Sequence, residues 1–126
     1  RRWMPGKGSV PMREYRAAWA EAVRVFGWNE VSTYLLLGLG EDPDETVAAA
    51  TELIEMGVYP FVVPFRPLAG TLATDVDGVP APDSRMVASV TARVGAALRR
   101  AGMLGAAQSA GCAACGACSA LSCEGA

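Results

Sequence analysis

The residues best suited to chemistry are four cysteines gathered at one end of the chain. They lie within the last 15 positions, at Cys112, Cys115, Cys118 and Cys123. The first three follow the spacing Cys-x2-Cys-x2-Cys that opens the cluster-binding segment of bacterial ferredoxins. Small residues between them leave backbone amides free to point at cluster sulfurs. Such clustering indicates metal or cluster ligation in a reducing compartment, rather than disulfides spread through a secreted fold.

The identity of the metal is open at this point. A tetrahedral zinc site of four cysteines is the alternative to an iron–sulfur cluster. Zinc sites usually pair two Cys-x2-Cys units across a long spacer, whereas cysteines at every third position are typical of iron–sulfur ligation. We therefore expect an iron–sulfur cluster on the four cysteines, with zinc as the second choice and disulfides or free thiols as the third.

Composition excludes several kinds of chemistry and partner. The 126-residue chain contains no histidine, so His-ligated metals, Ser–His triads and histidine bases are excluded within it. Hydrophobic residues make up 52% and charged residues 19%, which is typical of a folded domain. The net charge of −2 gives no reason to expect nucleic acid or an anionic membrane as a partner. No apolar run reaches the roughly 20 residues of a membrane span.

Three helices and two strands are expected to position these groups. The strand segments are VSTYLLLGL and YPFVVPF; the first is continuously apolar in its second half, which indicates a parallel strand covered on both faces. Pro60 and Pro64 cannot donate ladder hydrogen bonds, so the second strand should lie at a sheet edge. The element order implies a right-handed crossover. The expected helices are 11–26, 43–56 and 84–102, the strands 31–39 and 59–65, and the irregular segments 69–83 and 102–126.

The ends of the two strands are a second place for chemistry, because functional residues gather at the carboxyl ends of parallel strands. Gly38 and Gly40 could let the backbone approach a ligand, and Arg66 could bind a carboxylate or a phosphate. The structural alternative is that both glycines only make a turn and that Glu41 complements a helix dipole. Arg66 could equally form a surface ion pair. Composition and spacing leave these alternatives open.

Residues 29–71 resemble a known family. The segment NEVSTYLLLGLGEDPDETVAAATELIEMGVYPFVVPFRPLAGT is similar to the fifth strand, following helix and sixth strand of radical S-adenosylmethionine (SAM) enzymes, particularly the biotin-synthase-like branch. The family motif Gly-x-Ile-x-Gly-x-x-Glu corresponds to residues 34–41. Leu36 stands for the isoleucine, Gly38 and Glu41 match, and Tyr34 replaces the first glycine. The cysteine-rich end resembles the C-terminal ending of a radical SAM group found with nitrilase gene clusters.

The resemblance implies the C-terminal fragment of a partial (β/α)6 TIM-like barrel, an α/β fold, over residues 1–101. Residues 102–126 would form a cysteine-rich tail with an auxiliary [4Fe–4S] cluster. The implied partners are SAM, a small-molecule substrate and an electron donor such as flavodoxin or ferredoxin, in the cytoplasm, with no nucleic acid or membrane. Arg66 would in addition meet the substrate. The implied cofactor-binding residues are Leu36, Gly38, Glu41, Val63 and Arg66.

One family feature does not occur in this sequence. Radical SAM enzymes hold their catalytic [4Fe–4S] cluster with Cys-x3-Cys-x2-Cys near the first strand, and the chain has no such spacing. We therefore expect the catalytic cluster on a preceding N-terminal half and the chain alone to be unable to cleave SAM. A half barrel should also expose the edge of its first strand and be poorly soluble. The alternative function is a non-enzymatic iron–sulfur or zinc module on an α/β scaffold.

Overall fold

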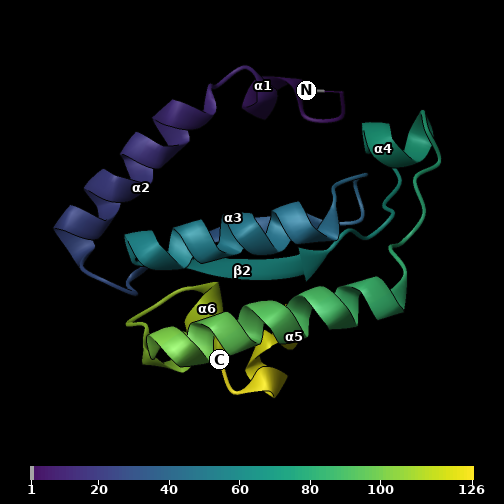
Figure 1. The fold of residues 1–126 in the computed structure, drawn as a ribbon. Coiled ribbons are helices and arrows are strands. Elements are labelled where there is room, and N and C mark those ends of the chain that lie inside the picture. Colours follow the sequence, from purple (N-terminus) through teal and green to yellow (C-terminus); the bar gives the residue numbers. More distant parts are fainter. Residues whose placement is uncertain (1) are drawn as a thin grey trace.

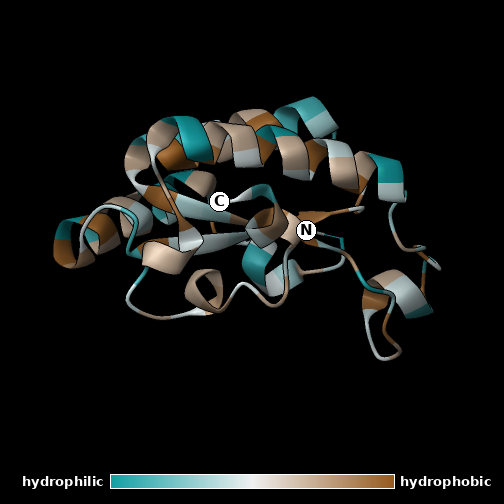
Figure 2. Ribbon diagram, turned by 90° about the horizontal axis from the view of Figure 1, so that it is seen from below, coloured by the Kyte–Doolittle hydropathy of each residue, from teal (hydrophilic) through white to brown (hydrophobic). Residues whose placement is uncertain are grey.

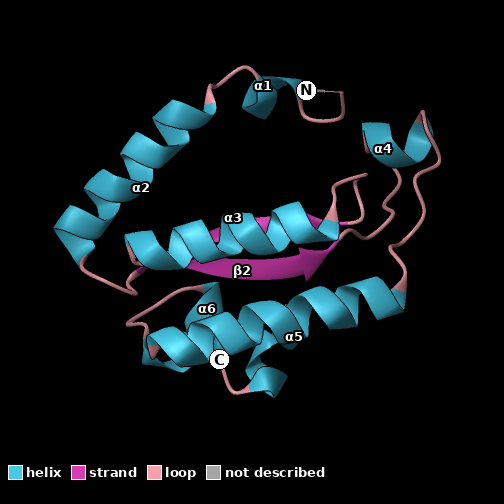
Figure 3. Ribbon diagram, viewed as in Figure 1, coloured by secondary structure: helices cyan, strands magenta, loops and turns pink. Residues whose placement is uncertain are grey.

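Two parallel strands form the centre of the fold, and helices surround them. The computed structural model describes residues 2–126. Helices account for most of the regular structure, and loops join them to the strands (Figure 3). In chain order the elements are α1 (Pro5–Gly8), α2 (Met12–Phe26), β1 (Val31–Leu37), α3 (Pro43–Met56), β2 (Val58–Pro64), α4 (Leu72–Asp75), α5 (Ser84–Ala101), η1 (Gly105–Ala107), α6 (Cys112–Cys115) and η2 (Ala120–Glu124).

The sheet consists of β1 and β2, joined through α3. The strands pair in parallel, with Val31 opposite Val58 and Leu37 opposite Pro64. The amide of Phe65 extends the ladder by donating a hydrogen bond of 2.7 Å to the carbonyl of Leu37. The expected α/β class is therefore confirmed, and each strand lies within two residues of its expected position.

Helices α3 and α5 lie together on one face of this sheet (Figures 1 and 2). Side chains alternate along a strand, so every second residue of β1 and β2 points toward these helices. Leu37 and Val62 on this face are buried in one apolar cluster with Ala50 of α3 and with Val90 and Val94 of α5. Burial of this cluster provides the main apolar contribution to stability.

The ends of α3 and α5 form as the sequence predicts. Asp42 caps α3 by accepting a hydrogen bond of 2.7 Å from the amide of Asp44. Gly57 ends α3 in the left-handed conformation, with φ +87°, and a Cβ at this position would lie only 2.8 Å from the ring of Trp28. Gly102 ends α5 in the same way, with φ +66°. Glycine is the residue that reaches this conformation without steric cost.

The burial of β1 differs from the expectation that both faces are covered. Alternate side chains of β1 are exposed, among them Tyr34 (55%) and Leu36 (40%). The facing residues of β2 are buried, since Tyr59 and Phe61 expose no more than 2%. The physical reason is that residues 102–126, called the tail below, contact β2 through α6 and η2. The apolar run in β1 therefore marks a strand covered on one face in this chain.

The apolar stripe of α2 is also less buried than expected. None of its residues is buried, and Phe26 is 68% exposed. Trp19 is half-buried beside the ring of Tyr15, with centroids 6.0 Å apart. The helix contacts only β1 and α3 to any extent and otherwise stands away from the sheet as an arch (Figure 1). The helical spacing is confirmed, but no element among residues 2–126 buries this stripe.

Regular structure occurs in two segments expected to be irregular: α4 lies within residues 69–83, and η1, α6 and η2 lie in the tail. The tail docks on the sheet through Met103, Ala113 and Leu121, each at most 5% exposed. Its small residues explain how the backbone packs so closely. A Cβ at Gly105 would lie 2.7 Å from the carbonyl oxygen of Ala113. The small residues that predicted an irregular segment therefore allow the tail to pack closely on the core formed by the sheet and the helices.

Burial of Tyr59 should make the free energy of unfolding fall as the pH rises into the alkaline range. Its side chain is 1% exposed, and this burial raises the pKa of Tyr59 above its ordinary value of 10.0. A raised folded-state pKa means that the stabilisation is complete below about pH 10 and is lost as pH rises through the folded pKa. We expect the free energy of unfolding of Tyr59→Phe to fall less than that of the wild type between about pH 9 and pH 11, a range that brackets the ordinary tyrosine pKa. Urea unfolding across this range, with Tyr15→Phe as control, measures it; equal losses in the two variants would contradict it.

Candidate functional site

A pocket at the carboxyl ends of the strands brings three expected cofactor-binding residues together. Leu36 comes from β1 and Val63 from β2, and Arg66 lies two residues after the end of β2. The volume is about 350 Å³. Residues 36 and 63 are paired across the sheet, so their side chains share the face opposite α3 and α5. This strand-end pocket is lined by Leu36, Val63, Pro64, Phe65, Arg66, Leu68, Thr71 and Cys118.

Cys118 is the contribution of the tail to the strand-end pocket. The neighbouring Ser119 anchors this part of the tail, because its hydroxyl donates a hydrogen bond of 2.5 Å to the carbonyl of Val62. The hydroxyl also accepts a bond from the amide of Leu121, whose side chain is buried. The Cys118 thiol therefore lies beside the strand ends because Ser119, the next residue, is fixed to β2 and Leu121, three residues on, is fixed in the core.

Gly38 and Glu41, the other two expected cofactor-binding residues, shape the loop after β1. The Glu41 carboxylate accepts hydrogen bonds from the amides of Gly38 (2.5 Å) and Leu39 (2.7 Å). Gly38 has φ +101°, and a Cβ there would lie 2.7 Å from the ring of Pro82. Neither residue lines the strand-end pocket, although Glu41 and Leu36 share a second pocket along β1. Gly38 thus has the turn role given as its structural alternative, whereas the role of Glu41 in binding the preceding amides was not expected.

Arg66 is free to meet an anion. Within residues 2–126 it forms no ion pair with a carboxylate, and its side chain is exposed. The ion-pair alternative considered for this residue is therefore not realised in the described part of the chain. A guanidinium presents a planar set of donors that matches carboxylate and phosphate oxygens.

Tyr34 provides a contact to the cysteines that the sequence did not indicate. Its hydroxyl donates a hydrogen bond of 2.7 Å to Sγ of Cys112, and its ring meets that of Phe61 edge to face, with centroids 5.4 Å apart. The hydrogen bond to Cys112 raises the pKa of Tyr34, with smaller contributions from desolvation and from the charges of Cys112 and Cys118. The residue that departs from the family motif thus touches the cysteine-rich tail.

The four cysteines do not converge on one point. All are exposed free thiols, and residues 2–126 contain no group of three or more cysteine, aspartate or glutamate side chains arranged to hold a metal ion. Cys112 lies at Tyr34, Cys118 at the strand-end pocket, and Cys123 at a separate cavity beside α5. In this structure the thiols of Cys112, Cys118 and Cys123 lie at three different places, so a four-thiolate cluster stays a prediction from spacing and we derive no chemical step through it.

Comparison of the chain with protein-family models, with curated proteins and with solved structures finds no match. Within the described residues no helix has both the length and the apolar character needed to cross a membrane.

Proposed function

We propose that the chain is the C-terminal part of a radical SAM enzyme, in which the strand-end pocket contacts SAM. The observation that carries the proposal is the convergence of Leu36, Val63 and Arg66 on one pocket at the carboxyl ends of parallel strands. The sequence resemblance names the same three residues as contacts of the cofactor. The packing of α3 and α5 on one face of the sheet also supports a barrel-like fold, which covers one face of its sheet with helices.

The residues at the pocket fit parts of the proposed ligand. Leu36 and Val63 offer an apolar wall, which suits an adenine ring. Arg66 suits a carboxylate on the substrate or on the methionyl portion of SAM. Glu41 holds the loop after β1 by its two backbone hydrogen bonds, which fixes the rim beside the pocket. The chemistry that bound SAM supplies in this family is reductive cleavage to a 5′-deoxyadenosyl radical.

The test compares the polypeptide encoded by the whole reading frame with the 126-residue chain, both reconstituted with iron and sulfide under reducing conditions. We expect 5′-deoxyadenosine from the whole polypeptide and none from the chain alone. Leu36→Asp in the whole polypeptide should lower the rate by about tenfold or more, because a carboxylate disrupts the apolar wall.

Val76→Asp is the matched control, since Val76 is 71% exposed and lines none of the pockets described above. This variant should retain the wild-type rate. The proposal fails if the whole polypeptide, loaded with iron and sulfide, yields no 5′-deoxyadenosine, or if the chain alone yields it.

The iron–sulfur cluster of the tail remains a prediction from cysteine spacing. We expect the reconstituted chain to retain iron and acid-labile sulfide with broad visible absorption, and the Cys112→Ser/Cys118→Ser double variant to lose most of both, because a cluster needs its thiolates. Binding of zinc alone, without sulfide, would instead favour a structural metal module. Elemental analysis after desalting distinguishes the two outcomes.

A further inference from the structure

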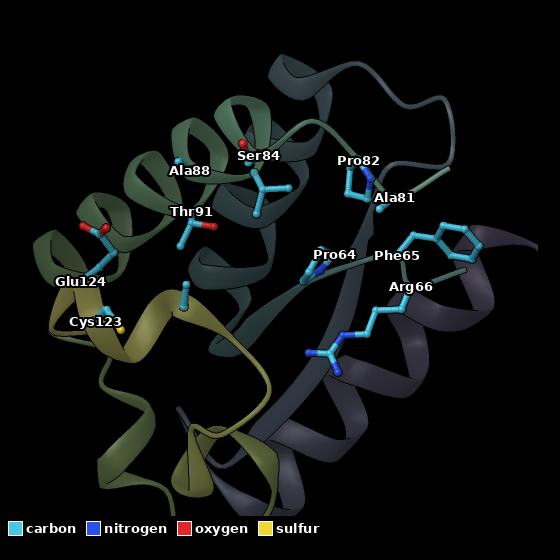
Figure 4. Close-up of a pocket in the computed structure, with 12 residues that line it drawn as sticks. Pro64, Phe65, Arg66, Ala81, Pro82, Ser84, Ala88, Thr91, Cys123 and Glu124 are labelled. Carbon is cyan, nitrogen blue, oxygen red and sulfur yellow. The ribbon is translucent and has the colours of Figure 1, made fainter. Parts of the chain in front are cut away.

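A further cavity lies between the carboxyl end of β2, the first half of α5 and η2, on the side of β2 away from the strand-end pocket (Figure 4). Its volume is about 460 Å³, within the range of small-molecule sites. We call it the helix-side cavity. It is lined by Pro64, Phe65, Arg66, Ala81, Pro82, Ser84, Val87, Ala88, Thr91, Ala120, Cys123 and Glu124.

The walls of the helix-side cavity are mainly apolar. Pro64 and Pro82 lie on the strand side, and Ala88 and Thr91 of α5 lie opposite them (Figure 4). Val87 of α5 also lines the cavity. Thr91 is 4% exposed and closes the α5 wall. An apolar concavity with few polar groups is the usual form of a small-molecule site, since apolar surface gives affinity and polar groups set orientation.

The charges around this cavity leave one cation without a partner. Glu124, at the tail side, forms a long ion pair of 3.9 Å with the guanidinium of Arg99, whose hydrogen bond goes to the backbone carbonyl of Glu124. Arg66, at the strand side, forms no ion pair within residues 2–126. The cavity therefore combines an apolar wall with one unpaired cation, Arg66, on its strand side and one ion-paired carboxylate, Glu124, on its tail side.

We propose that the helix-side cavity binds a small amphipathic monocarboxylate, with its apolar body against the α5 wall and its carboxylate on Arg66. A carboxylate matches the single charge and the planar donors of a guanidinium. A phosphate monoester, with a charge of about −1.5 to −2, would need further cations. The inference differs from the radical SAM proposal in its α5 and η2 walls, although both proposals use Arg66, since the two pockets share Pro64, Phe65 and Arg66.

The test uses octanoate and its neutral analogue 1-octanol as probes of the 126-residue chain in isothermal titration calorimetry. We expect octanoate to bind saturably and about tenfold or more tightly than 1-octanol, the range of a charge-assisted hydrogen bond. Arg66→Gln should remove this difference, whereas Arg85→Gln, an exposed arginine that does not line the cavity, should preserve it.

Two substitutions on α5 separate the cavity from general adsorption and from the strand-end pocket. Ala88→Phe fills the cavity and should abolish binding of both probes, while Ser89→Phe places the same group on an exposed face of α5 that does not line the cavity and should change nothing. Bound octanoate should also slow alkylation of Cys123 and leave Cys115 unaffected, as read by mass spectrometry. Equal binding of octanoate and 1-octanol, no saturable binding, or equal effects of the two phenylalanine variants would overturn the proposal.

Discussion

Leu121→Ala is expected to lower the free energy of unfolding by about 2–4 kcal/mol, the usual cost of a leucine truncated in a packed core. Its side chain is 1% exposed and belongs to the same apolar cluster as Leu37, Val62 and Val90. The effect is large because the tail is part of the core rather than an appendage. Urea unfolding followed by circular dichroism measures it.

Leu104→Ala is the matched control, because Leu104 lies in the same tail and is 43% exposed. It should change stability by no more than about 0.5 kcal/mol, as surface substitutions do. Equal, small effects of Leu121→Ala and Leu104→Ala would mean that the tail does not dock on the core. In that case Cys118 would not be held at the strand-end pocket.

Gly38→Ala is expected to destabilise the chain by about 2–4 kcal/mol, from left-handed backbone strain together with overpacking. The backbone has φ +101°, and the added methyl would lie 2.7 Å from the ring of Pro82. A shift of the loop would also disturb the two amides held by Glu41. Thermal and urea unfolding report the loss of stability.

Gly40→Ala separates the two causes. Gly40 lies in the same loop with φ +89°, but nothing lies within 4 Å of a Cβ built there. This substitution should therefore cost only the backbone strain, about 1 kcal/mol. If Gly38→Ala and Gly40→Ala lowered the free energy of unfolding equally, the close approach of residue 38 to Pro82 would not contribute to the effect.

The parts of the fold that follow from local chemistry could be predicted from the sequence. Asp42, Gly57 and Gly102 mark helix ends because caps and left-handed residues depend on their immediate neighbours. The strands were recognised by apolar runs bounded by turn residues. Both kinds of signal act over a few residues, so one sequence is enough to read them.

The parts that depend on contacts between distant residues could not be predicted. Glycine, alanine and serine in the tail suggested an irregular segment, and only packing shows that Gly105 and Ser119 permit close docking on β2. The hydrogen bond between Tyr34 and Cys112 joins residues 78 positions apart. Phe26 follows a helical stripe, but whether that stripe is covered depends on surfaces that the sequence pattern does not specify.

The site was predicted in part for the same reason. Leu36, Val63 and Arg66 converge because the ends of parallel strands must meet at one edge of a sheet. Glu41 was assigned to a ligand or a helix dipole, whereas its carboxylate binds the preceding amides. Cysteine spacing indicated ligation, yet spacing alone does not fix where each thiol points in a folded chain.

The central claim is that this chain completes a radical SAM barrel. The most direct test is to sequence the coding DNA upstream of the codon for Arg1. We expect a continuous reading frame that brings the protein to a barrel of roughly 200 residues or more, with Cys-x3-Cys-x2-Cys near its first strand. A stop codon in frame immediately upstream, or a long upstream frame without that cysteine spacing, would contradict the claim.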